Sequence, residues 1–192
     1  SLIKLVNKTK NIFNKKFGSE PTTTSVAPAR INIIGEHTDY NDGLSLPVAI
    51  DIWLCIGIRK RQDQCIRVYS ENLNKFCEFN LNNLHEHEVL WEKYIVGCLY
   101  EFNKTYKMDY GIEVCIYSEI PIGTGISSSA ALEVALINGL SSIFNLDIDD
   151  NSIIKMCQKV EHNHIQIKSG VLDQSAVLLS KDKFLLYLDF LN

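Results

Sequence analysis

Glu36, His37 and Asp39 place two carboxylates and an imidazole within four residues of the chain. They directly follow the apolar run Ile31-Asn32-Ile33-Ile34, which is typical of a buried strand. A surface loop needs no such mixture at that point, whereas a carboxylate can accept hydrogen bonds from two neighbouring hydroxyls at once. The pattern therefore predicts a pocket for a small molecule that carries several hydroxyl groups.

A second segment, 121–131, combines two glycines with three consecutive serines between an expected strand and an expected helix. Glycines let backbone N–H groups turn inward, and a helix N-terminus adds free donors and a partial positive charge for a phosphate. The segment lacks the Lys of a Walker loop, and Ser128 stands where the dinucleotide fingerprint needs a third glycine. Taken alone, a glycine-rich turn with a serine N-cap would explain it equally well.

A third group of residues suits phosphoryl transfer to an alcohol. That reaction needs an acceptor hydroxyl that is oriented and gives up its proton, and a cation that bridges the phosphates. Asp173, after the turn that begins at Gly170, suits the first task, and Glu161 with a serine hydroxyl suits the second. On spacing alone, Asp173 is more typical of a helix N-cap than of a general base.

Three segments together resemble the galactokinases, a branch of the GHMP small-molecule kinases. Residues 27–41 resemble the galactokinase signature, residues 121–131 resemble the GHMP nucleotide loop, and residues 170–174 resemble the family run G-I-M-D-Q. The chain departs from the family at Ala29, which is usually Gly, and at Ile126, which is usually Leu. The resemblance covers the chain from Thr22 onward.

The resemblance implies a role for individual residues. Two residues are expected to be catalytic, with the arginine beside the aspartate and the transferred phosphoryl group: Arg30 and Asp173. Four are expected to line the sugar site: Glu36, His37, Asp39 and Gly170. Six are expected to bind the nucleotide: Gly123, Gly125, Ser127, Ser128, Ser129 and Ala130. Mg²⁺ is expected between Glu161 and Ser129, with Ser128 as the alternative serine.

The implied reaction is transfer of the γ-phosphoryl group of ATP to the C1 hydroxyl of galactose, with Mg²⁺ as cofactor. Two alternatives remain open: a kinase for N-acetylgalactosamine or arabinose, and a related sugar sensor that binds without phosphorylating. The intact serine run and the presence of both Arg30 and Asp173 argue against the sensor.

Hydrophobic periodicity favours an α+β fold over a doubly wound sheet, because the elements do not alternate regularly. The resemblance implies a mixed sheet packed with helices, as in a GHMP-type N-terminal domain. Helices are expected at 2–17, 91–106, 127–144, 149–164 and 172–179. Strands are expected at 22–34, 44–50, 52–58, 65–69, 76–79, 112–118 and 184–190, with a hairpin-type turn at Asn41-Asp42-Gly43. Trp91 and Tyr94 are interpreted as helix packing and surface rather than as a base-stacking platform. Trp53 is interpreted as core or pocket wall, with a place beside an adenine as the alternative.

Composition suits one globular domain: 192 residues, 46% hydrophobic, with a net charge of −4 that argues against nucleic acid as partner. No apolar run approaches the roughly 20 residues of a membrane span. Six cysteines without a C-x-x-C pattern predict reduced thiols in a cytoplasmic protein. The histidine pairs of 85–88 and 161–164 are interpreted as structural, because no third metal ligand is near either pair.

The resemblance also implies a second domain, which carries a third glycine-rich motif and closes the active-site cleft. No such motif follows Asp173. We therefore expect residues 1–192 to be a GHMP-type N-terminal domain that lacks the C-terminal domain and is inactive alone. The full-length protein is expected to be a monomer, whereas the isolated part would expose an interface that favours self-association.

Overall fold

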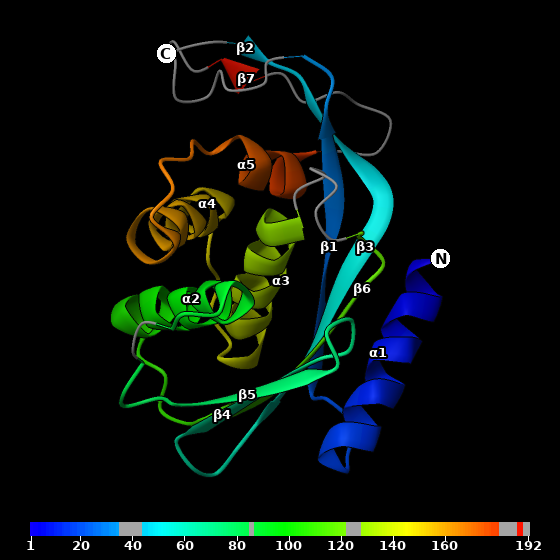
Figure 1. The fold of residues 1–192 in the computed structure, drawn as a ribbon, viewed down its shortest axis with the longest axis vertical. Helices are drawn as coiled ribbons and strands as arrows, with labels where there is room; N and C mark the ends of the chain where they lie inside the picture. The colour runs from blue at the N-terminus through cyan, green and yellow to red at the C-terminus, as the bar shows by residue number, and fades with distance from the viewer. Residues whose placement is uncertain (35–43, 85–86, 122–127, 181–187, 190–192) are drawn as a thin grey trace.

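A mixed β-sheet separates the N-terminal helix from the other helices in the computed structural model (Figure 1). The structure describes residues 1–34, 44–84, 87–121, 128–180 and 188–189. Within them the main sheet has the order β1-β3-β6-β4-β5, in which only β4 and β6 pair in parallel. Its strands are β1 Thr23–Asn32, β3 Pro47–Lys60, β4 Cys65–Ser70, β5 Lys75–Asn80 and β6 Ile112–Ser118. This mixed sheet with packed helices confirms the α+β prediction.

The helices begin and end close to the predicted positions. They are α1 Leu2–Phe17, α2 Leu90–Tyr106, α3 Ser128–Ile143, α4 Asp150–Val160, α5 Leu172–Leu179 and the π-helix η1 Glu161–Ile165. Asp149 caps α4 by accepting a hydrogen bond from the Ser152 backbone N–H at 3.0 Å, as its residue type suggested. No helix in these described ranges is long and apolar enough to cross a membrane.

Two predictions need correction. The expected strands 44–50 and 52–58 form one continuous strand from Pro47, while Leu44–Ser45 is a separate short strand, β2. The expected helix 149–164 is α-helical only to Val160 and continues as η1. Of the expected strand 184–190, the described part is β7, Leu188–Asp189, which pairs with β2. The turn Asn41-Asp42-Gly43 lies outside the described residues.

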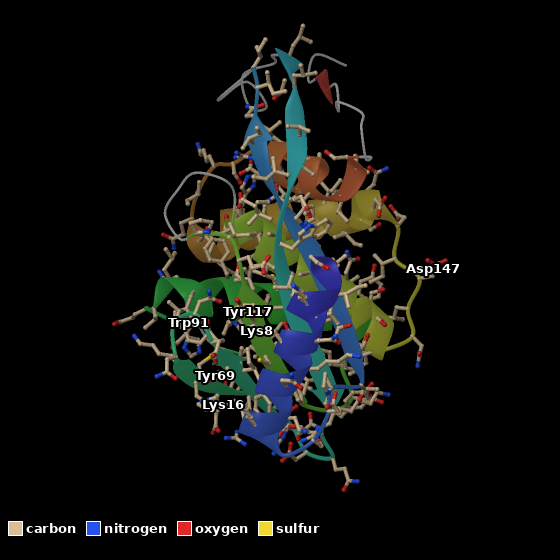
Figure 2. The ribbon with its side chains drawn as sticks, turned by 90° about the vertical axis from the view of Figure 1, so that its right-hand side faces the viewer. Lys8, Lys16, Tyr69, Trp91, Tyr117 and Asp147 are labelled. Carbon is tan, nitrogen blue, oxygen red and sulfur yellow. The ribbon has the colours of Figure 1, made fainter. Side chains whose placement is uncertain are left out.

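Helix α1 covers the face of the sheet opposite the other helices. It ends at Gly18, whose φ of 79° is the left-handed conformation that glycine adopts without strain. Phe13 packs on Tyr69 and Cys115 of the sheet. Lys8 and Lys16 lie over the rings of Tyr117 and Tyr69, at 4.1 and 4.2 Å from the ring centroids (Figure 2). Strand β6 is consequently buried on both faces.

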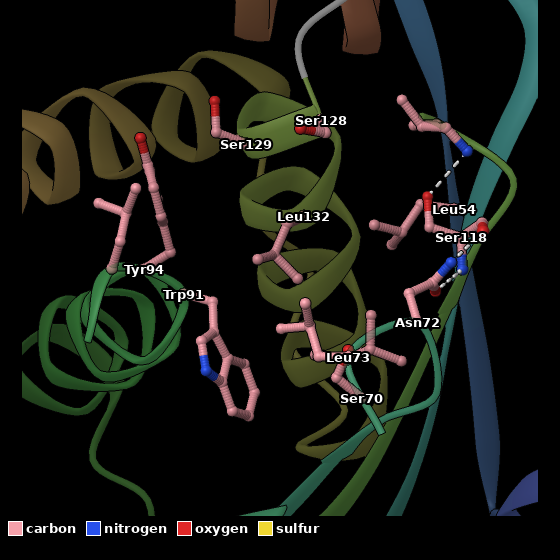
Figure 3. Close-up of a pocket in the computed structure, with 13 residues that line it drawn as sticks. Leu54, Ser70, Asn72, Leu73, Trp91, Tyr94, Ser118, Ser128, Ser129 and Leu132 are labelled. Atoms are coloured by element: carbon pink, nitrogen blue, oxygen red, sulfur yellow. Dashed lines mark hydrogen bonds between the residues drawn. The ribbon is translucent and has the colours of Figure 1, made fainter. Parts of the chain in front are cut away.

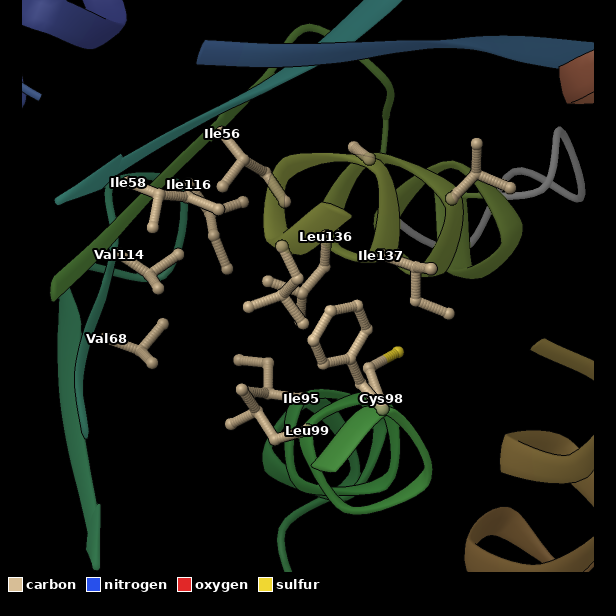
Figure 4. Packing of buried hydrophobic residues seen from close by; sticks show 14 of the residues in the cluster. Ile56, Ile58, Val68, Ile95, Cys98, Leu99, Val114, Ile116, Leu136 and Ile137 are labelled. Atoms are coloured by element: carbon tan, nitrogen blue, oxygen red, sulfur yellow. The ribbon is translucent and has the colours of Figure 1, made fainter. Parts of the chain in front are cut away.

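The main core lies between the sheet and helices α2 and α3 (Figure 4). Ile58 and Val114 of the sheet meet Ile95 and Leu99 of α2 and Leu136 of α3, all fully buried. Burial of each such side chain contributes about 1.5–3 kcal/mol to folding. Because α3 is buried along its length, it is fixed in place, and its N-terminal residues lie at the edge of the core.

All six cysteines are free thiols, and five of them are buried. This agrees with the prediction of reduced cysteines. Burial raises the pKa of the Cys77 thiol, as well as those of Cys98 and Cys157. These thiols therefore stay protonated at neutral pH and act as small apolar core residues.

Candidate active site

Arg30 and Asp173 are 143 residues apart in the sequence and form a close ion pair in the structure. The Arg30 Nε donates to Asp173 Oδ1 at 2.7 Å, and Arg30 Nη2 lies 2.5 Å from the same oxygen. The Arg30 side chain is 10% exposed and that of Asp173 is 29% exposed. The guanidinium is therefore held inside the protein, while the carboxylate remains accessible to a ligand.

The pair joins strand β1 to the first turn of helix α5. The register of β1 against β3 shifts between Pro28 and Ala29, so that Pro28 pairs with Trp53 and Ala29 with Ile50. The register skips Asp51 and Ile52, so the extra residues of this bulge belong to β3, and Ala29 and Arg30 pair beyond it. On the other side, α5 begins at Leu172, so that Asp173 lies in its first turn. Buried Gly170 immediately precedes this turn.

The segment expected to bind the sugar leaves the sheet close to Arg30. Its residues Glu36, His37 and Asp39 lie outside the described residues. Its two ends are joined by backbone hydrogen bonds: Ile33 N–H to Leu46 O at 3.0 Å, and Leu46 N–H to Ile34 O at 2.9 Å. The segment therefore starts and finishes at the end of β1 that carries Arg30.

Of the expected nucleotide-binding residues, Ser128, Ser129 and Ala130 form the first turn of α3. Ala130 is fully buried, whereas both serines line a cavity of about 210 Å³ (Figure 3). Gly123, Gly125 and Ser127 lie outside the described residues. The first backbone N–H groups of a helix have no partner within it, so this end of α3 can bind an anionic group.

The cavity beside Ser128 and Ser129 has mainly apolar walls. Trp91 and Tyr94 of α2 pack against the core, as expected, and they also line the cavity, which the sequence did not reveal (Figure 3). Trp53, by contrast, is not among the lining residues and donates to Asp51 Oδ1 at 2.6 Å. The remaining lining residues are Leu54, Ser70, Asn72, Leu73, Leu90, Ile116, Ser118, Ile120 and Leu132.

Tyr94 connects the cavity to a group of acidic residues. Burial raises the pKa of Tyr94 to about 12, with further contributions from the carboxylates of Glu161 and Glu133, while a hydrogen bond with Ser129 opposes the shift. The Tyr94 side chain is therefore hydrogen-bonded to Ser129 and lies within electrostatic range of Glu161. Glu161 is 7% exposed and accepts a hydrogen bond from Ser169 Oγ.

The chemistry of Ser129 and Glu161 fits Mg²⁺. A serine hydroxyl and a carboxylate supply the hard oxygen ligands that this ion prefers, and Mg²⁺ commonly uses one or two carboxylates together with substrate phosphates. Among the described residues, no cluster of three or more His, Cys, Asp or Glu side chains could hold a metal. Phosphate oxygens and water would complete the coordination of a cation held by Ser129 and Glu161.

Helix α2 fixes the π-helix that begins with Glu161. Its buried Glu101 accepts hydrogen bonds from Asn163 Nδ2 at 3.2 Å and from His164 Nε2 at 3.1 Å. Gly97 permits the close contact, because a Cβ at that position would lie 2.7 Å from Val160 Cγ1. π-helices are frequent at functional sites. His164 thus has a structural contact, and the helix departs from α geometry where Glu161 is placed.

Comparisons with known proteins agree with this arrangement. Residues 93–181 match the family model "GHMP kinases N terminal domain", and residues 11–60 match "Galactokinase galactose-binding signature". The structure superposes on mevalonate kinase with a TM-score of 0.74 at 26% identity, covering 81% of this chain and 51% of that one. The fold is that of the N-terminal domain of a GHMP kinase.

Similarity to one branch of these kinases is stronger. The chain is 40% identical to the galactokinase of Fusobacterium nucleatum, with 85% of this chain and 43% of that protein covered. It is 37% identical to that of Clostridium beijerinckii, with 96% and 48% covered. The crystal structure of Lactococcus lactis galactokinase complexed with galactose matches with a TM-score of 0.89 at 33% identity, covering 100% and 50%.

The chain belongs to the galactokinase family. It spans about half the length of the curated relatives that it matches.

Proposed function

We propose that the chain is the sugar- and nucleotide-binding part of a kinase that transfers the γ-phosphoryl group of ATP to the C1 hydroxyl of galactose. The observation that carries the proposal is the Arg30–Asp173 pair, in which an accessible carboxylate is held by a buried guanidinium. The pair lies where β1 and α5 meet, and α3 packs against both elements. Membership of the galactokinase family supports a sugar as the acceptor.

The residues of this site suit each part of the reaction. Asp173 accepts the proton of the C1 hydroxyl as that oxygen bonds to the γ-phosphorus and ADP leaves. Arg30 fixes the carboxylate and neutralises negative charge on the transferred group. The first turn of α3 donates hydrogen bonds to the phosphates. Ser129 and Glu161 would hold Mg²⁺, which when bound neutralises charge on the phosphate oxygens.

The sugar is assigned to the segment after β1, with Glu36, His37 and Asp39 as the residues that bind its hydroxyls and Gly170 as part of the same site. Carboxylates at 36 and 39 suit neighbouring hydroxyls, because each can accept two hydrogen bonds. The position of the segment's ends next to Arg30 supports this assignment, since the acceptor hydroxyl must reach Asp173.

We further propose that the cavity between α2 and α3 binds the adenine base. Ser128 and Ser129, the serines proposed to bind the phosphates, are among its lining residues, and its walls offer two aromatic rings, Trp91 and Tyr94. Asn72 is tied to Ser118 by two hydrogen bonds of 2.8 Å, so it stabilises the rim of the cavity through the turn after β4. The flat aromatic faces of adenine are complementary to a largely apolar slot.

Replacing Trp91 with Ala should weaken nucleotide binding by about tenfold, because base–aromatic contacts are worth about 1–3 kcal/mol. The other tryptophan provides a matched control: Trp53→Ala also removes an indole, but outside the cavity, and should leave the Kd for ADP unchanged. Calorimetric titration of both variants with ADP measures the difference. Equal Kd values for Trp91→Ala and the unmodified protein would exclude Trp91 from the nucleotide site.

The proposed activity is tested by measuring ADP release with MgATP and a panel of sugars, using the complete protein. We expect turnover with galactose and a 1-phosphorylated product. Faster turnover of N-acetylgalactosamine or arabinose than of galactose would instead identify the protein as a kinase for that related sugar. Galactose binding without ADP release would indicate a sensor, and an absence of both would refute the proposal.

We also propose that a C-terminal domain completes and closes this site, so that residues 1–192 alone turn over slowly or not at all. The match to about half of each curated relative supports this proposal. In the complete protein we expect a monomer, whereas the separate chain would self-associate through the surface that the second domain covers. A cytoplasmic location is part of the same proposal, supported by six free thiols.

A further inference from the structure

We propose that Glu133 is a positioning residue, which links the nucleotide-binding helix α3 to the helix that carries Asp173. Gln174 Nε2 donates a hydrogen bond to Glu133 Oε2 at 2.9 Å. Both residues are inside the protein, with exposed fractions of 0% for Glu133 and 1% for Gln174. The inference rests on the proposed kinase function and adds a residue to its machinery.

Stability alone does not account for a glutamate at this place. Glu133 is the only charged residue within the α3 sequence Ser128–Ile143, and its neighbours are the core residues Val134 and Leu136. Its second oxygen, Oε1, is buried and has no hydrogen-bond partner among the described residues. Burial, together with the nearby carboxylates of Glu161 and Asp173, raises its pKa well above the usual range. A well-packed apolar residue would avoid this desolvation cost.

The position of the bond shows what it can do. Glu133 lies one helical turn after Ser129, which lines the cavity proposed to bind the nucleotide. Gln174 directly follows Asp173 in α5, a helix of 8 residues whose N-cap, Val171, makes no side-chain cap hydrogen bond. Asp173 is thus held by Arg30 from β1, and the turn that carries it is held by Glu133 from α3. The bond ties the carboxylate to the same helix that binds the phosphates.

Substitutions at both ends of the bond test this in the complete protein. Glu133→Leu and Gln174→Leu each remove it, and each should lower kcat for galactose by about tenfold or more with both KM values within about twofold, because misplaced groups slow chemistry more than binding. Glu133→Gln keeps an acceptor oxygen for Gln174 and should stay within about threefold of the unmodified kcat. Ser141→Ala is the matched control, since it removes a hydrogen bond of 2.7 Å to Leu146 O from the far end of α3.

The Asp173→Asn background separates positioning from a general structural effect. If Glu133 acts through Asp173, adding Glu133→Leu to Asp173→Asn should change the remaining rate by less than about twofold. Melting temperatures identify any variant that fails to fold, in which case Gln174→Leu carries the test. An unchanged kcat in Glu133→Leu, or the same fold-loss in both backgrounds, would overturn the inference. If the unmodified protein phosphorylates no sugar, the proposed function fails instead.

Discussion

Replacing Asp173 with Asn should slow phosphoryl transfer by about 10²–10⁴-fold, the usual cost of losing a general base. Asparagine keeps the shape of the side chain and one acceptor oxygen, so the C1 hydroxyl can still dock, and the Kd for galactose should change by only a few-fold. It cannot take up the hydroxyl proton, and it loses the charge that pairs with Arg30 at 2.7 Å. Single-turnover rates at saturating galactose and MgATP, together with calorimetric galactose binding, separate the two effects.

If the transition state is loose, Asp173 would contribute mainly by positioning the reacting groups rather than by accepting a proton. When little bonding to the acceptor oxygen has developed, proton removal contributes less than the placement of the reacting groups. In that case the Asp173→Asn variant retains much of the phosphoryl-transfer rate, and replacing Arg30 lowers that rate more. A rate equal to that of the unmodified protein would remove the base assignment altogether.

The order and type of most elements could be predicted from periodicity. Helix α1 has clear helical spacing and a glycine at its end, so both of its limits follow from local sequence. The join between the expected strands 44–50 and 52–58 could not be predicted, because alternation changes at a bulge without ending the strand. The π-helix was equally hidden, since it depends on Glu101 and Gly97 of a different helix.

The candidate site, too, could be predicted only in part from the sequence. Arg30 and Asp173 could be proposed as site residues because they stand in recognisable segments, although nothing local shows that Arg30 contacts Asp173. Glu161 lies outside those segments and was proposed from the family resemblance alone. The cavity lining was missed, because an aromatic residue on a helix face has the same local signature whether it meets the core or a ligand. Glu133 did leave a signal, as a single charge in an otherwise uncharged helix.

Replacing Arg30 with Ala should have the other large effect, lowering kcat by about 10³-fold, the lower end of the range for an arginine that stabilises a phosphoryl transition state. The change removes the cation that contacts the Asp173 carboxylate through two nitrogen atoms. It also leaves a part-buried carboxylate short of a partner, which should lower the free energy of unfolding by about 1–3 kcal/mol. Arg30→Lys should recover only part of the rate, because an ammonium group cannot reproduce the planar fork.

A second arginine supplies the control for charge and size. Arg67 pairs with Glu78 at 2.7 Å, with side chains 34% and 58% exposed, so Arg67→Ala should change stability by less than about 1 kcal/mol and leave kcat unaltered. Denaturant unfolding and single-turnover kinetics on Arg30→Ala, Arg30→Lys and Arg67→Ala provide the comparison. Equal rates for Arg30→Ala and Arg67→Ala would show that Arg30 serves the fold alone. A full rate for Arg30→Lys would show that position 30 needs only a positive charge, without the bidentate geometry.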